Sequence, residues 1–138
     1  MSSVKVKWQN DLYFQGVSGS GQTVQLEGAT GTGQGVRPSE MLLLALGGCT
    51  GMDIVSLLQK FEARLDHFQV ELGGEKHSQH PKSFRTITAV YHISGDVTPQ
   101  QAWKAVSSSY KKYSVIANSL QANIEYRVLL NGEEITEK

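Results

Sequence analysis

The only cysteine of the chain, Cys49, lies in the stretch LGGCTGMD, between two apolar segments. Glycines occupy three nearby positions, and Asp53 follows four residues after the thiol. Free cysteines are among the most buried residues and pack as small hydrophobes, so a packing role is one interpretation. A thiolate is also a strong nucleophile, so a reactive cysteine is the alternative. The residue types alone leave both open.

The glycines around Cys49 favour an unusual local backbone. Inside a helix, each glycine costs roughly 1 kcal/mol relative to alanine. A helix accepts this cost where another backbone approaches closely or where the helix bends. Asp53 lies one helical turn after Cys49, where its charge would oppose formation of a thiolate. A reactive thiolate would therefore need a cation nearby, and Arg37 is the only arginine that precedes Cys49.

Cys49 belongs to the longest predicted helix. Pro38-Ser39-Glu40 opens this helix, with Ser39 as the expected N-cap and Glu40 at the positive end of the helix dipole. The helix is expected to continue to about Ala63, and its side chains are apolar nearly all round. Such a helix is buried, but a chain of 138 residues has difficulty burying it on every side. The pattern therefore predicts a partner chain.

The remaining elements follow from hydrophobic periodicity and turn signals. Alternating apolar residues predict strands at 4–8, 12–17, 22–27, 68–73, 86–93 and 124–130, the last closed by Asn131-Gly132. The glycine-rich segment 28–36 is expected to be a loop. Thr98 and Pro99 form a helix start, which predicts helices at about 99–113 and 115–120. Strands in blocks indicate an α+β fold with antiparallel sheet, in the order βββ-α-ββ-α-α-β.

Composition excludes several classes of function. Thirteen basic and thirteen acidic residues give a formal net charge of zero, so nothing favours nucleic acid or an anionic membrane as partner. A single cysteine excludes an intrachain disulfide and fits a reducing compartment. No apolar run reaches the roughly 18 residues of a membrane span, and the first residues lack a signal-peptide core. We expect a single cytoplasmic domain over residues 1–138.

The sequence does not indicate a metal site or any other cofactor. His77 and His80 share one polar loop, but no cysteine or acidic pair accompanies them at ligand spacing. Solvated loop histidines are the simpler interpretation. No serine lies in a Gly-x-Ser-x-Gly elbow, so a hydrolase has no support either.

Residues 37–60, RPSEMLLLALGGCTGMDIVSLLQK, resemble the central helix of the OsmC/Ohr family, in the subgroup with a Gly-Gly-Cys-Thr/Ser-x-x-Asp signature. The likeness extends to the VKW start and to the late YKKYSVIANSL segment. The resemblance implies an intertwined homodimer with two central helices between sheets and with active sites at the dimer interface. It also implies thiol-dependent reduction of organic hydroperoxides, in defence against oxidative or osmotic stress.

The resemblance assigns roles to individual residues. Cys49 matches the peroxidatic cysteine, which attacks the peroxide and becomes a sulfenic acid. The family's second cysteine, which forms a disulfide with the first, belongs where this chain has Ser114, so an external thiol would have to reduce Cys49. Arg37 and Glu40 are the candidates for the activating arginine and glutamate. In a straight helix Glu40 lies about 13.5 Å from Cys49 along the axis and on the opposite face, so a kink or a partner chain would be required.

Whether the protein is an enzyme stays open at the level of sequence. The alternative is a non-catalytic binding protein that uses the same interface pocket for a small apolar or thiol-containing ligand. A third possibility is that Cys49 only packs. The candidates for lining such a pocket, each of which could equally be core, are Tyr13, Phe14, Ser39, Met52 and Tyr113.

Overall fold

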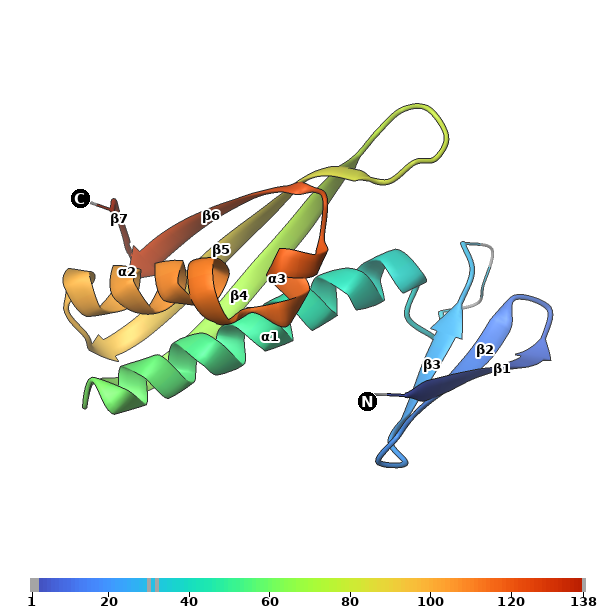
Figure 1. Ribbon diagram of the computed structural model, residues 1–138, viewed down its shortest axis with the longest axis horizontal. Helices are drawn as coiled ribbons and strands as arrows, with labels where there is room; N and C mark the ends of the chain where they lie inside the picture. The colour runs from blue at the N-terminus through green and yellow to red at the C-terminus, as the bar shows by residue number, and fades with distance from the viewer. Residues whose placement is uncertain (1–2, 30, 32, 138) are drawn as a thin grey trace. The chain divides into compact units, whose positions relative to one another are not determined.

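The computed structural model describes residues 3–29, 31 and 33–137 and has the mixed α+β composition that the sequence predicts (Figure 1). It forms two compact units, and the division falls between Leu42 and Leu43, inside the long helix. Each unit carries its own sheet. The single domain expected from the sequence stays a prediction.

The N-terminal unit contains the predicted three-stranded meander. Strands β1 (Val4–Asn10), β2 (Tyr13–Ser18) and β3 (Thr23–Glu27) pair antiparallel in sequence order. Glu27, at the end of β3, is buried, and its carboxylate accepts a hydrogen bond of 2.7 Å from the Gly33 amide. This bond holds part of the glycine-rich loop. The expectation that β1 is half-buried is wrong, because all seven of its residues are exposed.

Helix α1 spans Pro38–Lys60. The predicted N-cap at Ser39 is wrong, because the helix begins one residue earlier, at Pro38, where the missing N–H of proline is tolerated. Glu40 does lie in the first turn, and its carboxylate accepts a hydrogen bond of 3.1 Å from the Arg37 amide. The helix ends at Lys60, before the predicted Ala63, because Glu62 has a left-handed φ of 58°.

The C-terminal unit contains a four-stranded sheet. Strands β4 (Arg64–Lys76), β5 (Phe84–Asp96), β6 (Asn123–Leu130) and β7 (Glu133–Ile135) are neighbours in this order. The prediction of a wholly antiparallel sheet is wrong, because β5 and β6 pair parallel. The helical connection between them is long enough to return the chain to the same end of the sheet, which a parallel pair requires.

Strand β7 is absent from the predicted order. It follows Asn131 and Gly132, which have φ angles of 50° and 86°. Two successive positive φ angles are typical of a tight hairpin turn, and Asn-Gly is the strongest sequence signal for one. The dipeptide that was expected to end the last strand therefore turns the chain into one more short strand.

The connection between β5 and β6 contains three helical segments. Helix α2 (Pro99–Ser108) has the predicted start, with a full capping box between Thr98 and Gln101. The predicted continuation to Tyr113 is a π-helical turn, Ser109–Tyr113, rather than α-helix. Helix α3 (Val115–Ser119) follows directly, with Ser114 as its N-cap.

The core of the C-terminal unit lies between its sheet and its helices. Helix α2 and the C-terminal part of α1 cover the same face of the sheet (Figure 1). The buried apolar side chains at this interface include Ile54, Leu58, Ala89, Tyr91, Ile93, Ala102, Val106 and Val128. Helix α1 is long and apolar enough to cross a membrane by length and composition, but two of its buried residues, Ile54 and Leu58, belong to this core.

Two of the three glycines near Cys49 allow α1 to approach β4. A Cβ atom on Gly47 would lie 2.7 Å from Leu72 Cδ1, and one on Gly51 would lie 3.2 Å from the Phe68 ring. A Cβ on Gly48 would meet no atom within 4 Å. The close approach that the sequence suggested is thus made to the sheet by Gly47 and Gly51, whereas Gly48 faces outward.

This division predicts opposite effects of alanine at adjacent positions. Within one chain, Gly48→Ala meets no atom and should gain about 0.5–1 kcal/mol, because alanine is the better helix former. Gly47→Ala gains the same propensity but forces Leu72 to move, and overpacking costs about 1–3 kcal/mol. Urea denaturation should place Gly47→Ala at least about 1 kcal/mol below Gly48→Ala. Equal stabilities would show that the packing against Leu72 does not constrain the helix.

Candidate functional site

Cys49 and Ser114, which are 65 residues apart in sequence, meet in the C-terminal unit. The Ser114 hydroxyl donates a hydrogen bond of 3.3 Å to the Cys49 sulfur. Ser114 is buried, with 1% of its surface exposed, whereas Cys49 is partly exposed. The thiol is therefore held by a polar contact from inside while a reagent can still reach it from outside. This arrangement suits a nucleophile better than a purely packed cysteine.

The π-helical turn sets the position of Ser114. The Ser114 amide donates a hydrogen bond of 2.7 Å to the Ser109 carbonyl, across the five-residue step of a π-helix. Its hydroxyl also accepts a bond of 3.0 Å from the Ala117 amide and so caps α3. Single π-turns inside helices are frequent at functional sites. Here the turn directs a serine side chain toward the cysteine of another helix.

Asp53 has a structural partner that the sequence did not reveal. The Ser109 hydroxyl donates a hydrogen bond of 3.0 Å to Asp53 Oδ2, and Ser109 itself is buried. The carboxylate one turn after Cys49 therefore ties α1 to the π-helical turn. Asp53 also lines a small cavity of about 140 Å³ with Tyr113.

A chain of buried hydroxyl groups runs beside the cysteine. Thr50 Oγ1 lies 2.6 Å from the Tyr91 hydroxyl, which lies 2.6 Å from the Tyr110 hydroxyl. Thr50 also donates to the Leu46 carbonyl at 2.9 Å. Burial raises the pKa of Tyr91 and of Tyr110 above the usual value of a phenol, so both rings stay protonated. These bonds join α1, β5 and the π-helical turn at the level of Cys49.

Sequence analysis missed Thr50, Tyr91, Ser109 and Tyr110 because each had an adequate simpler interpretation. Tyr91 fitted the alternation of a strand, and Tyr110 fitted the apolar spacing of a helix. The one available signal was that a buried tyrosine needs a partner for its hydroxyl. Nothing local identifies which partner that is.

An apolar groove runs along α1 beside Phe68 of β4, and Cys49 is not among its lining residues. Its volume is about 440 Å³, and its lining residues are Gly47, Gly48, Gly51, Met52, Val55, Ser56, Gln59 and Phe68. Met52, one of the predicted pocket residues, is 75% exposed. A methionine so exposed on an apolar surface indicates an interaction site.

The other predicted residues lie elsewhere. Arg37, Ser39 and Glu40 belong to the N-terminal unit, as do Tyr13 and Phe14. The Arg37 guanidinium lies 3.5 Å from the Ala29 carbonyl. Tyr13 lines a cavity of about 190 Å³ in that unit, and Phe14 pairs with Leu26 between strands. The roles of these residues stay predictions. Tyr113 is 54% exposed in the C-terminal unit.

Among the described residues, no three or more histidine, cysteine or acidic side chains are grouped so as to hold a metal ion. His92 Nε2 instead lies 2.7 Å from the Glu71 carboxylate on the sheet. The site around Cys49 therefore offers thiol chemistry within a hydroxyl-rich setting.

Comparison with known proteins gives one consistent family. A family model described as OsmC-like protein matches residues 31–128. Protein YhfA of Escherichia coli K12 is 34% identical over 118 residues, which cover 85% of this chain and 87% of YhfA. The matched region includes Cys49 and its helix.

Solved structures share the fold. A hypothetical protein from Aquifex aeolicus superposes with a TM-score of 0.86 at 22% identity, covering 94% of this chain and 96% of its own. The organic hydroperoxide resistance protein OhrB of Bacillus subtilis gives a TM-score of 0.63 at 12% identity, covering 94% and 97%. At these identities the likeness concerns the fold alone.

Proposed function

Because the chain belongs to the OsmC-like family, we propose that it is a one-cysteine, thiol-dependent peroxidase that reduces organic hydroperoxides. The observation that carries the proposal is the partly exposed Cys49 sulfur with the Ser114 hydroxyl 3.3 Å away. The name of the Bacillus subtilis neighbour, an organic hydroperoxide resistance protein, is consistent with this chemistry. Defence against oxidative or osmotic stress would be the setting.

In the first step the Cys49 thiolate attacks the terminal oxygen of the hydroperoxide. An S–O bond forms and the O–O bond breaks, and the alkoxide leaves and takes up a proton to become an alcohol. The sulfur is oxidised to a sulfenic acid. A hydroxyl donor stabilises an anionic sulfur more than a neutral one, so Ser114 supports the reactive form of Cys49.

In the second step an external dithiol reduces the sulfenic acid. One of its sulfurs attacks the Cys49 sulfur and releases water, which leaves a mixed disulfide. The second thiol of the reductant then displaces Cys49 and forms the oxidised, cyclic reductant. Serine cannot take the place of this second thiol, so the reductant must reach Cys49 itself. The partial exposure of Cys49 supports such access.

The cationic and acidic groups that activate the thiol are assigned to Arg37 and Glu40 by the resemblance alone. Both are exposed in the N-terminal unit, and Glu40 is already bonded to the Arg37 amide. We propose that they complete the site within a dimer.

We propose that the protein is a homodimer that pairs through the outer face of α1. Leu44, Gly48 and Met52 follow one another at four-residue spacing, so they form one stripe on this helix. Leu44 is 58% and Met52 is 75% exposed. An exposed apolar stripe of this kind typically marks an interface, and OsmC/Ohr proteins are typically homodimers.

Proteins of this family are also soluble and typically cytoplasmic, and we propose the cytoplasm as the location of this protein.

A specific observation favours a second candidate function. The groove along α1 is apolar, which favours binding of a small apolar or thiol-containing ligand without catalysis. This alternative requires that ligand binding survive in Cys49→Ser, as a thermal shift in a metabolite screen would detect. It also requires that peroxide consumption be independent of Cys49.

The peroxidase proposal predicts consumption of cumene hydroperoxide in the presence of excess dithiothreitol. Peroxide loss should saturate with substrate, and Cys49→Ser should reduce the rate to that of buffer and dithiothreitol alone, because no other thiol is present. The assay follows the remaining hydroperoxide with time. If wild type and Cys49→Ser consume peroxide equally slowly, the protein is not a peroxidase.

The place of Ser114 leads to a second prediction. Ser114→Cys should form an intramolecular disulfide with Cys49 after one equivalent of peroxide, because the two side chains already touch. Mass spectrometry should detect the loss of two hydrogens, and alkylation should find no free thiol. Ser108→Cys, on the preceding helical segment, serves as the matched control and should retain alkylatable thiols. A Ser114→Cys protein that keeps both thiols would contradict the assignment.

The dimer proposal is tested by sedimentation equilibrium. The wild-type protein should have twice the 15.1 kDa mass of one chain. Met52→Lys places a charge in the apolar stripe and should shift the protein to the monomer. Gln69→Lys adds the same charge at an exposed position of β4 and should leave the dimer intact. A wild type that is monomeric at all concentrations would exclude the proposal.

A further inference from the structure

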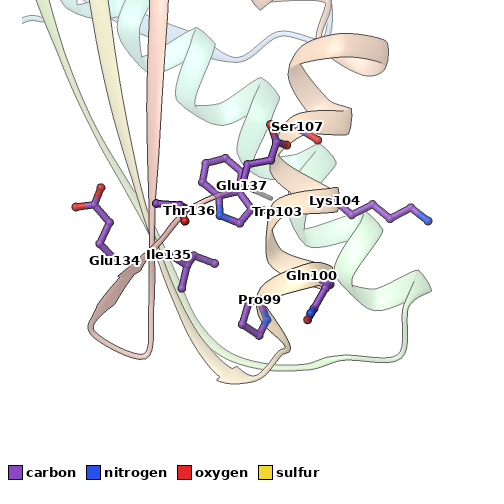
Figure 2. Close-up of a pocket in the computed structure, with 9 residues that line it drawn as sticks. All are labelled: Pro99, Gln100, Trp103, Lys104, Ser107, Glu134, Ile135, Thr136 and Glu137. Atoms are coloured by element: carbon purple, nitrogen blue, oxygen red, sulfur yellow. The ribbon is translucent and has the colours of Figure 1, made fainter.

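A second cavity of the C-terminal unit lies apart from the cysteine site, between α2 and the C-terminal residues. Figure 2 shows its lining side chains, which come from α2 and from the segment that includes β7. Its volume is about 590 Å³, within the range of small-molecule sites. The lining residues are Pro99, Gln100, Trp103, Lys104, Ser107, Glu134, Ile135, Thr136 and Glu137.

The charged side chains around this cavity are not equivalent. The Arg127 guanidinium donates to both oxygens of Glu134, at 3.2 and 2.6 Å, so this carboxylate is compensated. Lys104 Nζ lies 5.5 Å from the centre of the Phe61 ring, and Figure 2 shows its side chain extending away from Trp103. Among the described lining residues, Lys104 and Glu137 therefore have no ion-pair partner, and Glu137 is the negatively charged one.

Trp103 provides the aromatic wall of the cavity. Its ring contacts Tyr126 at a centroid distance of 6.0 Å, and Figure 2 shows Ser107 and Glu137 gathered near the indole. Burial, and then the charge of Glu137, raise the pKa of Tyr126, which also places this carboxylate beside the aromatic wall. The buried Nε1 of Trp103 has no hydrogen-bond partner among the described residues.

We propose that this cavity binds a small organic cation, with the Trp103 ring and the Glu137 carboxylate as its recognition groups. Tryptophan is the best aromatic partner for an ammonium group, and quaternary ammonium ligands are commonly held in this way. Glu137 supplies the opposite charge. Nothing in this site requires Cys49, so it is independent of the proposed peroxidase activity.

The experiment uses choline as the probe and Trp103 as the reporter. The chain has two tryptophans, so Trp8→Phe, in the N-terminal unit, leaves Trp103 as the only indole. Choline should change the Trp103 emission saturably in this variant, and it should raise the melting temperature of the wild-type protein. The uncharged isostere, in which a tert-butyl group replaces the trimethylammonium, should bind at least about tenfold more weakly.

Glu137→Gln supplies the matched control, because it removes the charge and keeps the shape. Choline binding should weaken at least about threefold in this variant, while Glu133→Gln, on the same strand segment but outside the cavity lining, should bind as the parent does. The proposal is overturned if choline produces no saturable response in either measurement. Equal binding of the uncharged isostere, or unchanged binding in Glu137→Gln, overturns it as well.

Discussion

The hydrogen-bonded chain of Thr50, Tyr91 and Tyr110 is the constraint on which the rest of the C-terminal unit depends. Its two contacts of 2.6 Å join α1, β5 and the π-helical turn inside the core. A buried hydroxyl that loses its partner costs about 1–3 kcal/mol, so these elements cannot slide past one another without leaving a phenol unpaired. These hydrogen bonds therefore fix the position of the π-helical turn relative to Cys49. The π-helical turn then fixes the position of Ser114.

Sequence patterns predicted the parts of this fold that depend on local chemistry. Thr98 and Pro99 specify a helix start wherever they occur, and alternation in β5 specifies which side chains face the core. The pairing of β5 with β6 is different, because alternation is the same in parallel and antiparallel strands. Their direction depends on where the intervening helices return the chain. Asn131-Gly132 is also a typical sequence of a hairpin turn. The prediction treated this dipeptide only as the end of the last strand.

The candidate site likewise has local features, which the sequence predicted, and contacts between distant residues, which it did not. The helix around Cys49 and its glycines are local features, so they were visible in the sequence. The contact of Cys49 with Ser114 and the bond between Asp53 and Ser109 join residues more than 50 positions apart, and no periodicity encodes them. Only the family resemblance pointed to Ser114. The structure also divides the glycines, since Gly47 and Gly51 face the sheet and Gly48 faces outward.

The two hydrogen bonds of the Ser114 hydroxyl explain why a serine suits this position, although a serine cannot form a disulfide with Cys49. Its oxygen accepts a bond of 3.0 Å from the Ala117 amide while its proton points to the Cys49 sulfur. A hydroxyl can do both, because it has one donor and two lone pairs, and serine is among the best N-cap residues. A thiol is a weak acceptor and would cap α3 poorly. The chain thus combines a well-capped α3 with a polar contact to Cys49.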